Sequence, residues 1–310
     1  MRLNIITKNH PIAQADPFIL KYNNEFYIFA SAMADEPGVS CYKSNSLNGD
    51  YEWLGYVFRM EGHKEYWAPS VIQIDDTFYM YVSTMKNDEE NCHMQTMRVA
   101  SAKHPAGPYV YLNDLIAPFS IDSHPVLTES GLYMFYSMND YETKRAGTKI
   151  VLDKMISPTE ISGNPIDVVL PSLEEEIFMK NRFKEGQDWY TIEGACYFRE
   201  GDYHYLLYSA NCYQNEYYFV GYAVCKSTEA DLSKLEFKKY PNEFTYSPLL
   251  AKNEFESGTG HNTVIKHNEE WYIVYHGRDL EGNDVPYDNR NMRIAKLIVN
   301  GEKLTVIREK

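Results

Sequence analysis

The chain has 310 residues, of which 44% are hydrophobic and 24% charged, a composition that excludes wholesale disorder. No stretch approaches the ~18 consecutive apolar residues of a membrane span, so no membrane partner is expected. The net charge of −14 excludes nucleic acid and anionic lipid as main partners, whereas the 27 tyrosines favour polar, uncharged ligands that stack on rings.

The N-terminal segment Met1–Lys8 lacks the long apolar stretch of a secretory signal, so we expect a cytoplasmic protein. The five cysteines contain no Cys-x-x-Cys pair, which argues against a disulfide framework or a zinc site. Neither observation fixes the oligomeric state, and a homo-oligomer remains compatible with the sequence.

Five short aromatic runs of similar sequence recur along the chain, and each has tyrosine in its second position. They are Phe26–Ser31, Phe78–Ser83, Leu132–Ser137, His204–Ser209 and Trp271–His276. Strand-favouring side chains of this kind predict buried β-strands. A polar turn and a further short apolar stretch precede each run, so the repeat unit is a β-hairpin.

The spacing leaves room for two more strands in each repeat, such as 97–101 and 220–224. Four strands repeated radially predict an all-β fold, a five-bladed β-propeller that forms one domain over residues 1–310. The alternative is a β-sandwich with five coincidentally similar hairpins. The one segment expected to be helical is 172–184.

The residue ten positions before each aromatic run belongs to the predicted innermost strand, which lines the central channel of a propeller. These residues are Asp16, Ala68 (beside Trp67), Asp122 and His261, and for the fourth run we assign Glu193, on the assumption of one extra residue in that hairpin. Like charges that converge on one channel cost free energy, so their retention indicates function.

Three carboxylates, a tryptophan and a histidine in one ring suit the hydrolysis of a glycosidic bond. One carboxyl group must hold a proton for the leaving group, and another must stay ionised to activate water. A third carboxylate raises the pKa of the acid by repulsion. Trp67 offers a flat face to a sugar ring, and an arginine of the C-terminal part, in 275–278 or 289–293, can contact hydroxyl groups.

At these residues the sequence resembles glycoside hydrolase family 43, the five-bladed arabinofuranosidases, xylosidases and arabinanases. The resemblance spans essentially the whole chain and rests on one motif per blade, in order. The motifs are Asp16-Pro17, Trp67-Ala68-Pro69, Ile121-Asp122, Glu193-Gly194, Gly258-Thr259-Gly260-His261 and the late Asn289-Arg290. Ser123 and Ala195 stand where the family often has proline, which leaves the linkage preference open.

The resemblance implies Asp16 as general base, Glu193 as general acid, and Asp122 as the residue that orients the acid and tunes its pKa. It implies substrate binding by Trp67, His261 and Arg290. The resemblance also implies that no cofactor is required. Members of the family often hold a cation in the central channel, so we expect a structural Ca²⁺ there that His261 contacts through a water molecule.

The expected activity is inverting, exo-acting hydrolysis by an α-L-arabinofuranosidase that acts on arabino-oligosaccharides or arabinose side chains of hemicellulose. The first alternative is a β-D-xylosidase, or a bifunctional enzyme, on xylo-oligosaccharides. A retaining hydrolase of a related family and a non-catalytic glycan-binding propeller are the others. Inversion requires the Asp16 and Glu193 carboxyl groups to stand ~6.5–9.5 Å apart, against ~5 Å for retention.

Overall fold

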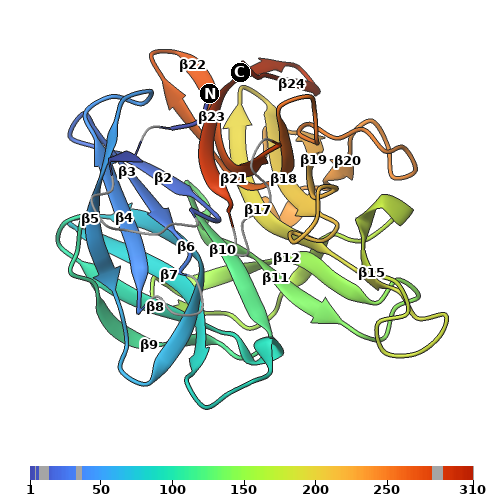
Figure 1. Cartoon of the computed structure of the whole chain (residues 1–310), viewed down its shortest axis with the longest axis horizontal. Coiled ribbons are helices and arrows are strands. Elements are labelled where there is room, and N and C mark those ends of the chain that lie inside the picture. Colours follow the sequence, from blue (N-terminus) through green and yellow to red (C-terminus); the bar gives the residue numbers. More distant parts are fainter. Residues whose placement is uncertain (4, 7–13, 33–36, 281–288, 310) are drawn as a thin grey trace.

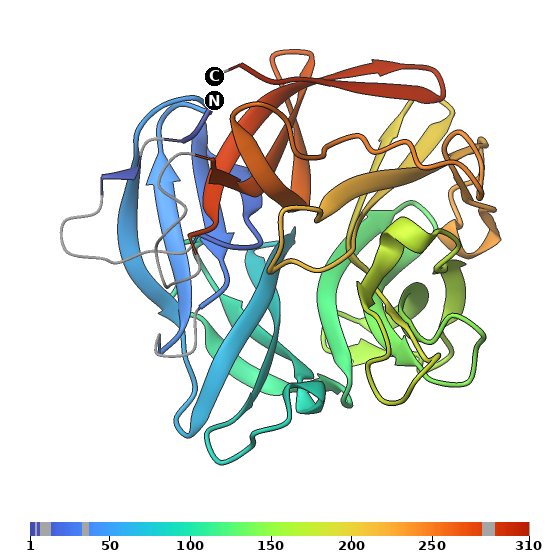
Figure 2. The same ribbon diagram turned by 45° about the vertical axis from the view of Figure 1, so that its right-hand side comes forward.

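A computed structural model of the chain describes residues 1–3, 5–6, 14–32, 37–280 and 289–309. Part of Met1–Lys8, on which the predicted location rests, lies outside these residues. Within them β-strands dominate, and they form five sheets in chain order around a common centre (Figures 1 and 2). No helix in the described ranges is long and apolar enough to cross a membrane.

The first two sheets are built from consecutive antiparallel strands, and the short parallel strand β1 is added to the first. The first sheet contains β1 (Ile5–Ile6), β2 (Phe18–Tyr22), β3 (Glu25–Ala30), β4 (Val39–Ser44) and β5 (Tyr51–Phe58). The second contains β6 (His63–Ile74), β7 (Thr77–Lys86), β8 (Thr96–Ala102) and β9 (Val110–Ile116), with the 3₁₀ helix η1 (Cys92–Met94) between β7 and β8.

The third sheet is larger and curled. It contains β10 (Ser120–Thr128), β11 (Gly131–Asp140), β12 (Gly147–Ser157), β13 (Glu160–Ile161), β14 (Ile166–Val169), β15 (Ile177–Met179) and β16 (Trp189–Tyr190). The helix predicted over 172–184 is wrong: only the single-turn η2 (Glu174–Glu176) forms there, and the chain then pairs as β15 with β16. Pairing with Trp189 and Tyr190 outweighs the helical preference of the glutamate run.

The last two sheets each have four strands. The fourth contains β17 (Ile192–Glu200), β18 (Tyr203–Ala210), β19 (Phe219–Lys226) and β20 (Lys238–Lys239), with η3 (Leu232–Lys234) before β20. The fifth contains β21 (Glu256–His267), β22 (Glu270–Asp279), β23 (Asn291–Asn300) and β24 (Lys303–Ile307). Both additional strands predicted inside repeats are confirmed, as β8 and β19.

The first long strand of each sheet lies innermost, and each contacts its counterparts in the neighbouring sheets. The circle runs through β2, β6, β10, β17 and β21 and back to β2. The all-β, propeller-like arrangement is therefore confirmed. Regular four-stranded blades are found only in part, because the first sheet has five strands and the third is a curled sheet of seven.

Burial on both faces explains the aromatic runs. In β3, Tyr27 and Phe29 enter a core shared with the second sheet, whereas Phe26 and Ile28 enter a core shared with the fifth. Successive residues of a strand point to opposite faces, so a sheet covered on both sides needs apolar side chains at every position. The repeat recognised in the sequence is this doubly buried second strand.

Candidate active site

Each innermost strand carries a residue with left-handed backbone geometry, either within the strand or, for Asp16, just before it. The φ angles are 53° at Asp16, 44° at Ala68, 59° at Asp122, 65° at Gly194 and 40° at His261. This geometry is uncommon for residues other than glycine, and it marks strained positions that cluster at functional sites. All five positions stand ten residues before an aromatic run.

The hairpin registers identify these residues as β-bulges. Before the bulge, the pairs are Trp67 with Ser83, Ile121 with Ser137, Glu193 with Ser209 and Gly260 with His276. Beyond the bulge, each register is shifted by one residue. A bulge redirects the local side chains, and bulges are frequent beside active sites.

The register corrects one prediction. The fourth hairpin has no extra residue, so Gly194, not Glu193, is the equivalent of Asp16 and Asp122. Glu193 shares its position with Trp67 of the second sheet. In the fourth sheet the carboxyl side chain therefore comes from the residue before the bulge, and the left-handed position itself is filled by the glycine that favours it.

Side chains of the second strands link the bulges of neighbouring sheets. Ser31 Oγ accepts the Ala68 N–H at 2.7 Å, and Ser209 Oγ accepts the His261 N–H at 2.7 Å. Between the fifth and first sheets the corresponding bond involves His276, whose Nδ1 accepts the Asp16 N–H at 3.1 Å. These bonds fix the backbone on which the site is built.

Asp16 is held as an anion. Its Oδ2 accepts the Ser31 hydroxyl at 2.5 Å, and its Oδ1 lies 3.4 Å from Arg290 Nη1 and 3.5 Å from His261 Nδ1. Burial alone would raise the pKa of Asp16, but attraction to His261 and Arg290 holds that pKa well below its ordinary value. Burial lowers the pKa of His276 to about 4, so its ring is neutral and Nδ1 is free to accept.

Glu193 and Asp122 are in the opposite situation. Burial raises the pKa of Glu193 to about 7, with a further rise from the charge of Asp16. Burial also raises the pKa of Asp122 to about 7, and the charges of Glu193 and Asp16 add to it. The prediction is that repulsion from Asp122 keeps Glu193 protonated. The structure instead makes burial the largest cause, and it is the charge of Glu193 that raises the pKa of Asp122.

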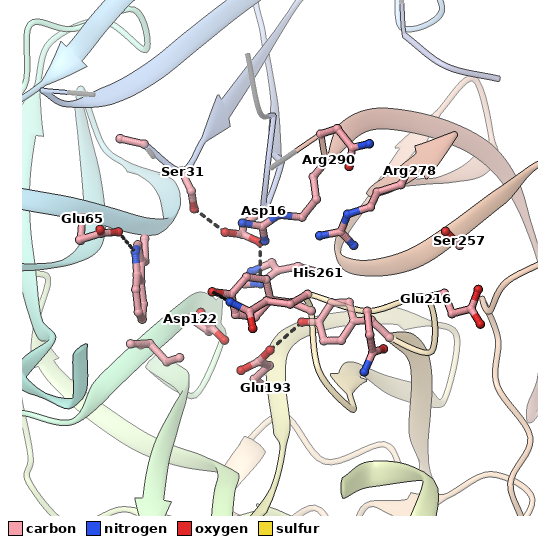
Figure 3. Close-up of a pocket in the computed structure, with 18 residues that line it drawn as sticks. Asp16, Ser31, Glu65, Asp122, Glu193, Glu216, Ser257, His261, Arg278 and Arg290 are labelled. Carbon is pink, nitrogen blue, oxygen red and sulfur yellow. Dashed lines mark hydrogen bonds and ion pairs between the residues drawn. The ribbon is translucent and has the colours of Figure 1, made fainter. Parts of the chain in front are cut away.

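Asp122 is placed to orient the first residues of β17 in the fourth sheet. Its Oδ2 accepts the backbone N–H of Gly194 at 3.0 Å, directly beside Glu193. In Figure 3 the side chains of Asp16, Asp122, Glu193 and His261 turn toward one another at the centre of the view.

Tyr218 is a site residue that no sequence motif predicts. Its hydroxyl donates a hydrogen bond to Glu193 Oε1 at 2.7 Å. Its ring is buried and stacks on His276, with centroids 5.8 Å apart and an interplanar angle of 7°. Gly260 makes this position available, because a methyl group there would lie 1.9 Å from the Tyr218 ring. Tyr218 precedes β19 and has no counterpart in the repeat; the one signal for it was the second glycine of Gly258-Thr259-Gly260-His261.

All six predicted site residues line one open pocket of ≈ 580 Å³, a volume typical of ligand sites. The Trp67 indole is fixed by a 2.8 Å bond from Nε1 to Glu65, and the Arg290 guanidinium lies 4.8 Å from the centre of the Tyr213 ring. Further lining residues come from outside the repeat positions: Glu65, Tyr213, Gln214, Asn215, Glu216, Tyr218, Ser257, Arg278 and Asn289.

The predicted channel cation finds no side-chain cage. Among the described residues, no three His, Cys, Asp or Glu side chains come together as metal ligands. Calcium takes six to eight oxygen ligands, so an ion beside His261 would depend on water and backbone oxygens. The cation stays a prediction.

A pocket that keeps one carboxyl group ionised and raises the pKa of another has the equipment of a glycosidase. The chain belongs to glycosyl hydrolases family 43, whose family model matches residues 9–302. It is 23% identical over 96% of its length to the extracellular exo-alpha-(1->5)-L-arabinofuranosidase of Streptomyces avermitilis. It spans only 62% of that relative.

Two solved structures extend the comparison. A thermostable family-43 glycoside hydrolase is 27% identical with a TM-score of 0.78, and the match covers 96% of this chain and 93% of that one. An endo-1,4-beta-xylanase of Bacteroides thetaiotaomicron is 21% identical with a TM-score of 0.73, covering 96% and 94%. At that identity the second shows a shared fold alone.

The contact between Gly260 and Tyr218 gives the first prediction. Gly260→Ala is expected to lower the free energy of unfolding by about 1–3 kcal/mol, because the added methyl group displaces a buried ring. Urea unfolding measures the change. The same substitution in a Tyr218→Ala background is the control, and it should cost clearly less. An equal cost in both backgrounds would show that Tyr218 is not what Gly260 accommodates.

Proposed function

We propose that the chain is an inverting, exo-acting α-L-arabinofuranosidase. Asp16 removes a proton from the attacking water, and Glu193 gives a proton to the departing glycosidic oxygen. Asp122 positions the Gly194 backbone beside Glu193, and Trp67, His261 and Arg290 bind the sugar or hold Asp16. The oxygen of water joins the anomeric carbon as the bond to the leaving group breaks, so the configuration inverts.

The observation that carries this assignment is the contrast between two carboxyl groups of one pocket. Asp16 accepts a hydrogen bond from the Ser31 hydroxyl and faces Arg290, so its carboxylate is ionised and can serve as a base. Glu193 is half-buried and accepts the Tyr218 hydroxyl at 2.7 Å, and its pKa is raised to about 7. Environments that push two pKa values apart assign the base and the acid.

The sugar preference rests on the named relative, an exo-arabinofuranosidase. The alternative is a β-D-xylosidase, or an enzyme with both activities, because a xylanase is among the solved structures that share the fold. Comparing the hydrolysis of nitrophenyl arabinofuranoside with nitrophenyl xylopyranoside decides between them. The cytoplasmic location and the homo-oligomer stay predictions.

We also infer that the curled third sheet is one blade of a five-bladed propeller. Its inner hairpin, β10 with β11, has the same bulge as the hairpins of the second, fourth and fifth sheets. In all four, the two residues paired just before the bulge are sixteen positions apart in the sequence. The additional strands β13 to β16 then represent an elaboration of the outer edge of that blade.

Removal of the acid gives the second prediction. Glu193→Ala should lose about 10²–10⁴-fold in kcat/KM on arabino-oligosaccharides, the usual contribution of a general acid. The loss should be far smaller on nitrophenyl arabinofuranoside, whose leaving group needs little protonation. Glu216→Ala removes a pocket carboxylate that is paired with Lys252 and should affect both substrates alike. An equal loss in Glu193→Ala would contradict the acid assignment.

The pH profile gives the third prediction. Asp16 must be ionised, so activity should persist far into the acid range, whereas deprotonation of Glu193 should end activity above about pH 7. The Tyr218 hydroxyl stabilises the ionised form of Glu193, so Tyr218→Phe should raise the pKa of Glu193 and move the alkaline limb of kcat/KM upward by about one pH unit.

The matched control for the pH experiment is Tyr275→Phe. It removes another buried tyrosine hydroxyl, bound to Glu256 at 3.0 Å, from residues that do not line the pocket. Its alkaline limb should stay in place. A downward shift in Tyr218→Phe, or the same shift in both variants, would contradict the account of Glu193.

A further inference from the structure

A cluster of aromatic rings lies on the third sheet, on the side where its strands reach the pocket. Trp189 is buried at its centre, with Tyr141 at 5.2 Å, Phe183 at 5.5 Å and His93 at 5.9 Å between ring centroids. Phe119 packs on the far side of His93 at 5.2 Å. We call these five residues the rim platform. Phe183 lies between β15 and β16, and Figure 1 shows β15 at the outer edge of the third sheet.

The rim platform is held together by contacts with Arg182, but part of its surface is exposed to solvent. Arg182 lies 5.0 Å from the ring of Trp189 and 5.4 Å from that of Phe183, and it donates to His93 Nε2 at 2.9 Å. Burial and the charge of Arg182 lower the pKa of His93, which keeps this acceptor neutral. Nevertheless Tyr141 is 50% exposed and Phe183 is 55% exposed.

Three connections join the platform to the pocket. Phe119 stands two residues before the pocket residue Ile121, about 7 Å along an extended chain. Gln95, directly after η1, donates to the backbone of the pocket residue Glu65 at 3.1 Å. Trp189 precedes Glu193 by four residues, with β16 leading into β17.

Chemistry selects the occupant of this surface. The general acid must touch the glycosidic oxygen, so the leaving-group sugars depart on the side of Glu193, and the platform residue Trp189 precedes Glu193 by four residues. Exposed aromatic faces beside fixed polar groups suit sugars, which present apolar C–H faces and hydroxyl edges together. The chain's net charge of −14 disfavours a polyanion on the same surface.

We propose that the rim platform binds the leaving-group part of an oligosaccharide, beyond the sugar next to the scissile bond. This inference rests on the proposed function. It makes the enzyme favour substrates of three or more units, with Tyr141 and Phe183 as the contact residues. Arg182 and His93 act by holding these rings in place.

The test compares the double variant Tyr141→Ala/Phe183→Ala with wild type on substrates of increasing length. For arabinotetraose, or xylotetraose if that series is preferred, kcat/KM should fall at least tenfold. For the disaccharide and the nitrophenyl glycoside, whose leaving groups do not reach the platform, the change should stay within about twofold. Tyr141→Phe, which keeps the ring, should behave as wild type on all of them.

Tyr217→Ala is the matched control, because Tyr217 is 63% exposed beside the pocket residue Glu216, in a different part of the rim. It should leave the dependence on length unchanged. Equal losses by the double variant on all substrates, or no loss on the tetrasaccharide, would overturn the proposal.

A binding measurement separates failure of this proposal from failure of the proposed function. Isothermal titration calorimetry of arabinotetraose and xylotetraose with Asp16→Asn needs no turnover. Adding the two alanine substitutions should weaken the preferred tetrasaccharide at least fivefold. Unchanged affinity would overturn the platform even if hydrolysis is confirmed. If wild type cleaves no glycoside and neither tetrasaccharide binds, the proposed function and the platform both fail.

Discussion

Left-handed backbone geometry within or just before the inner strand of every sheet is the constraint on which the site depends. Left-handed backbone geometry costs of order 1–3 kcal/mol at a residue other than glycine, and four of the five positions pay it. Hydrogen bonds that the N–H groups of Ala68, His261 and Asp16 donate to Ser31, Ser209 and His276 of the preceding sheet offset part of this cost. The strain places side chains from five distant segments around one pocket.

The positions of Asp16 and Glu193, within or just before the inner strands, also determine their pKa values. Asp16 lies where the fifth and first sheets meet, so it faces His261 and Arg290 and stays ionised. Glu193 is one residue before its bulge, and its carboxyl group meets a tyrosine hydroxyl instead of a cation. Burial therefore raises its pKa, and a small difference in position along two similar hairpins separates a carboxylate that stays ionised from a carboxyl group with a raised pKa.

The sequence predicted much of this, for a physical reason. Burial on both faces of each sheet imposes the aromatic runs, and a fixed distance from each run to its bulge reveals Asp16, Asp122 and His261. The same fixed distance, applied strictly, would have given Gly194 and placed Glu193 beside Trp67. Tyr218 could not be found this way, because it enters from a loop outside the repeat. The strand pairing of β15 with β16 also escaped, since it depends on contacts between segments rather than on local helix preference.

The central claim is that Asp16 activates water directly while Glu193 protonates the leaving group, in one displacement. Proton NMR of the first seconds of hydrolysis of an α-L-arabinofuranoside tests it most directly. The account predicts that β-arabinofuranose appears first and the other forms follow by mutarotation; for a β-xyloside, α-xylose would appear first. Initial formation of the anomer with the configuration of the substrate would contradict the account, because it requires a covalent intermediate.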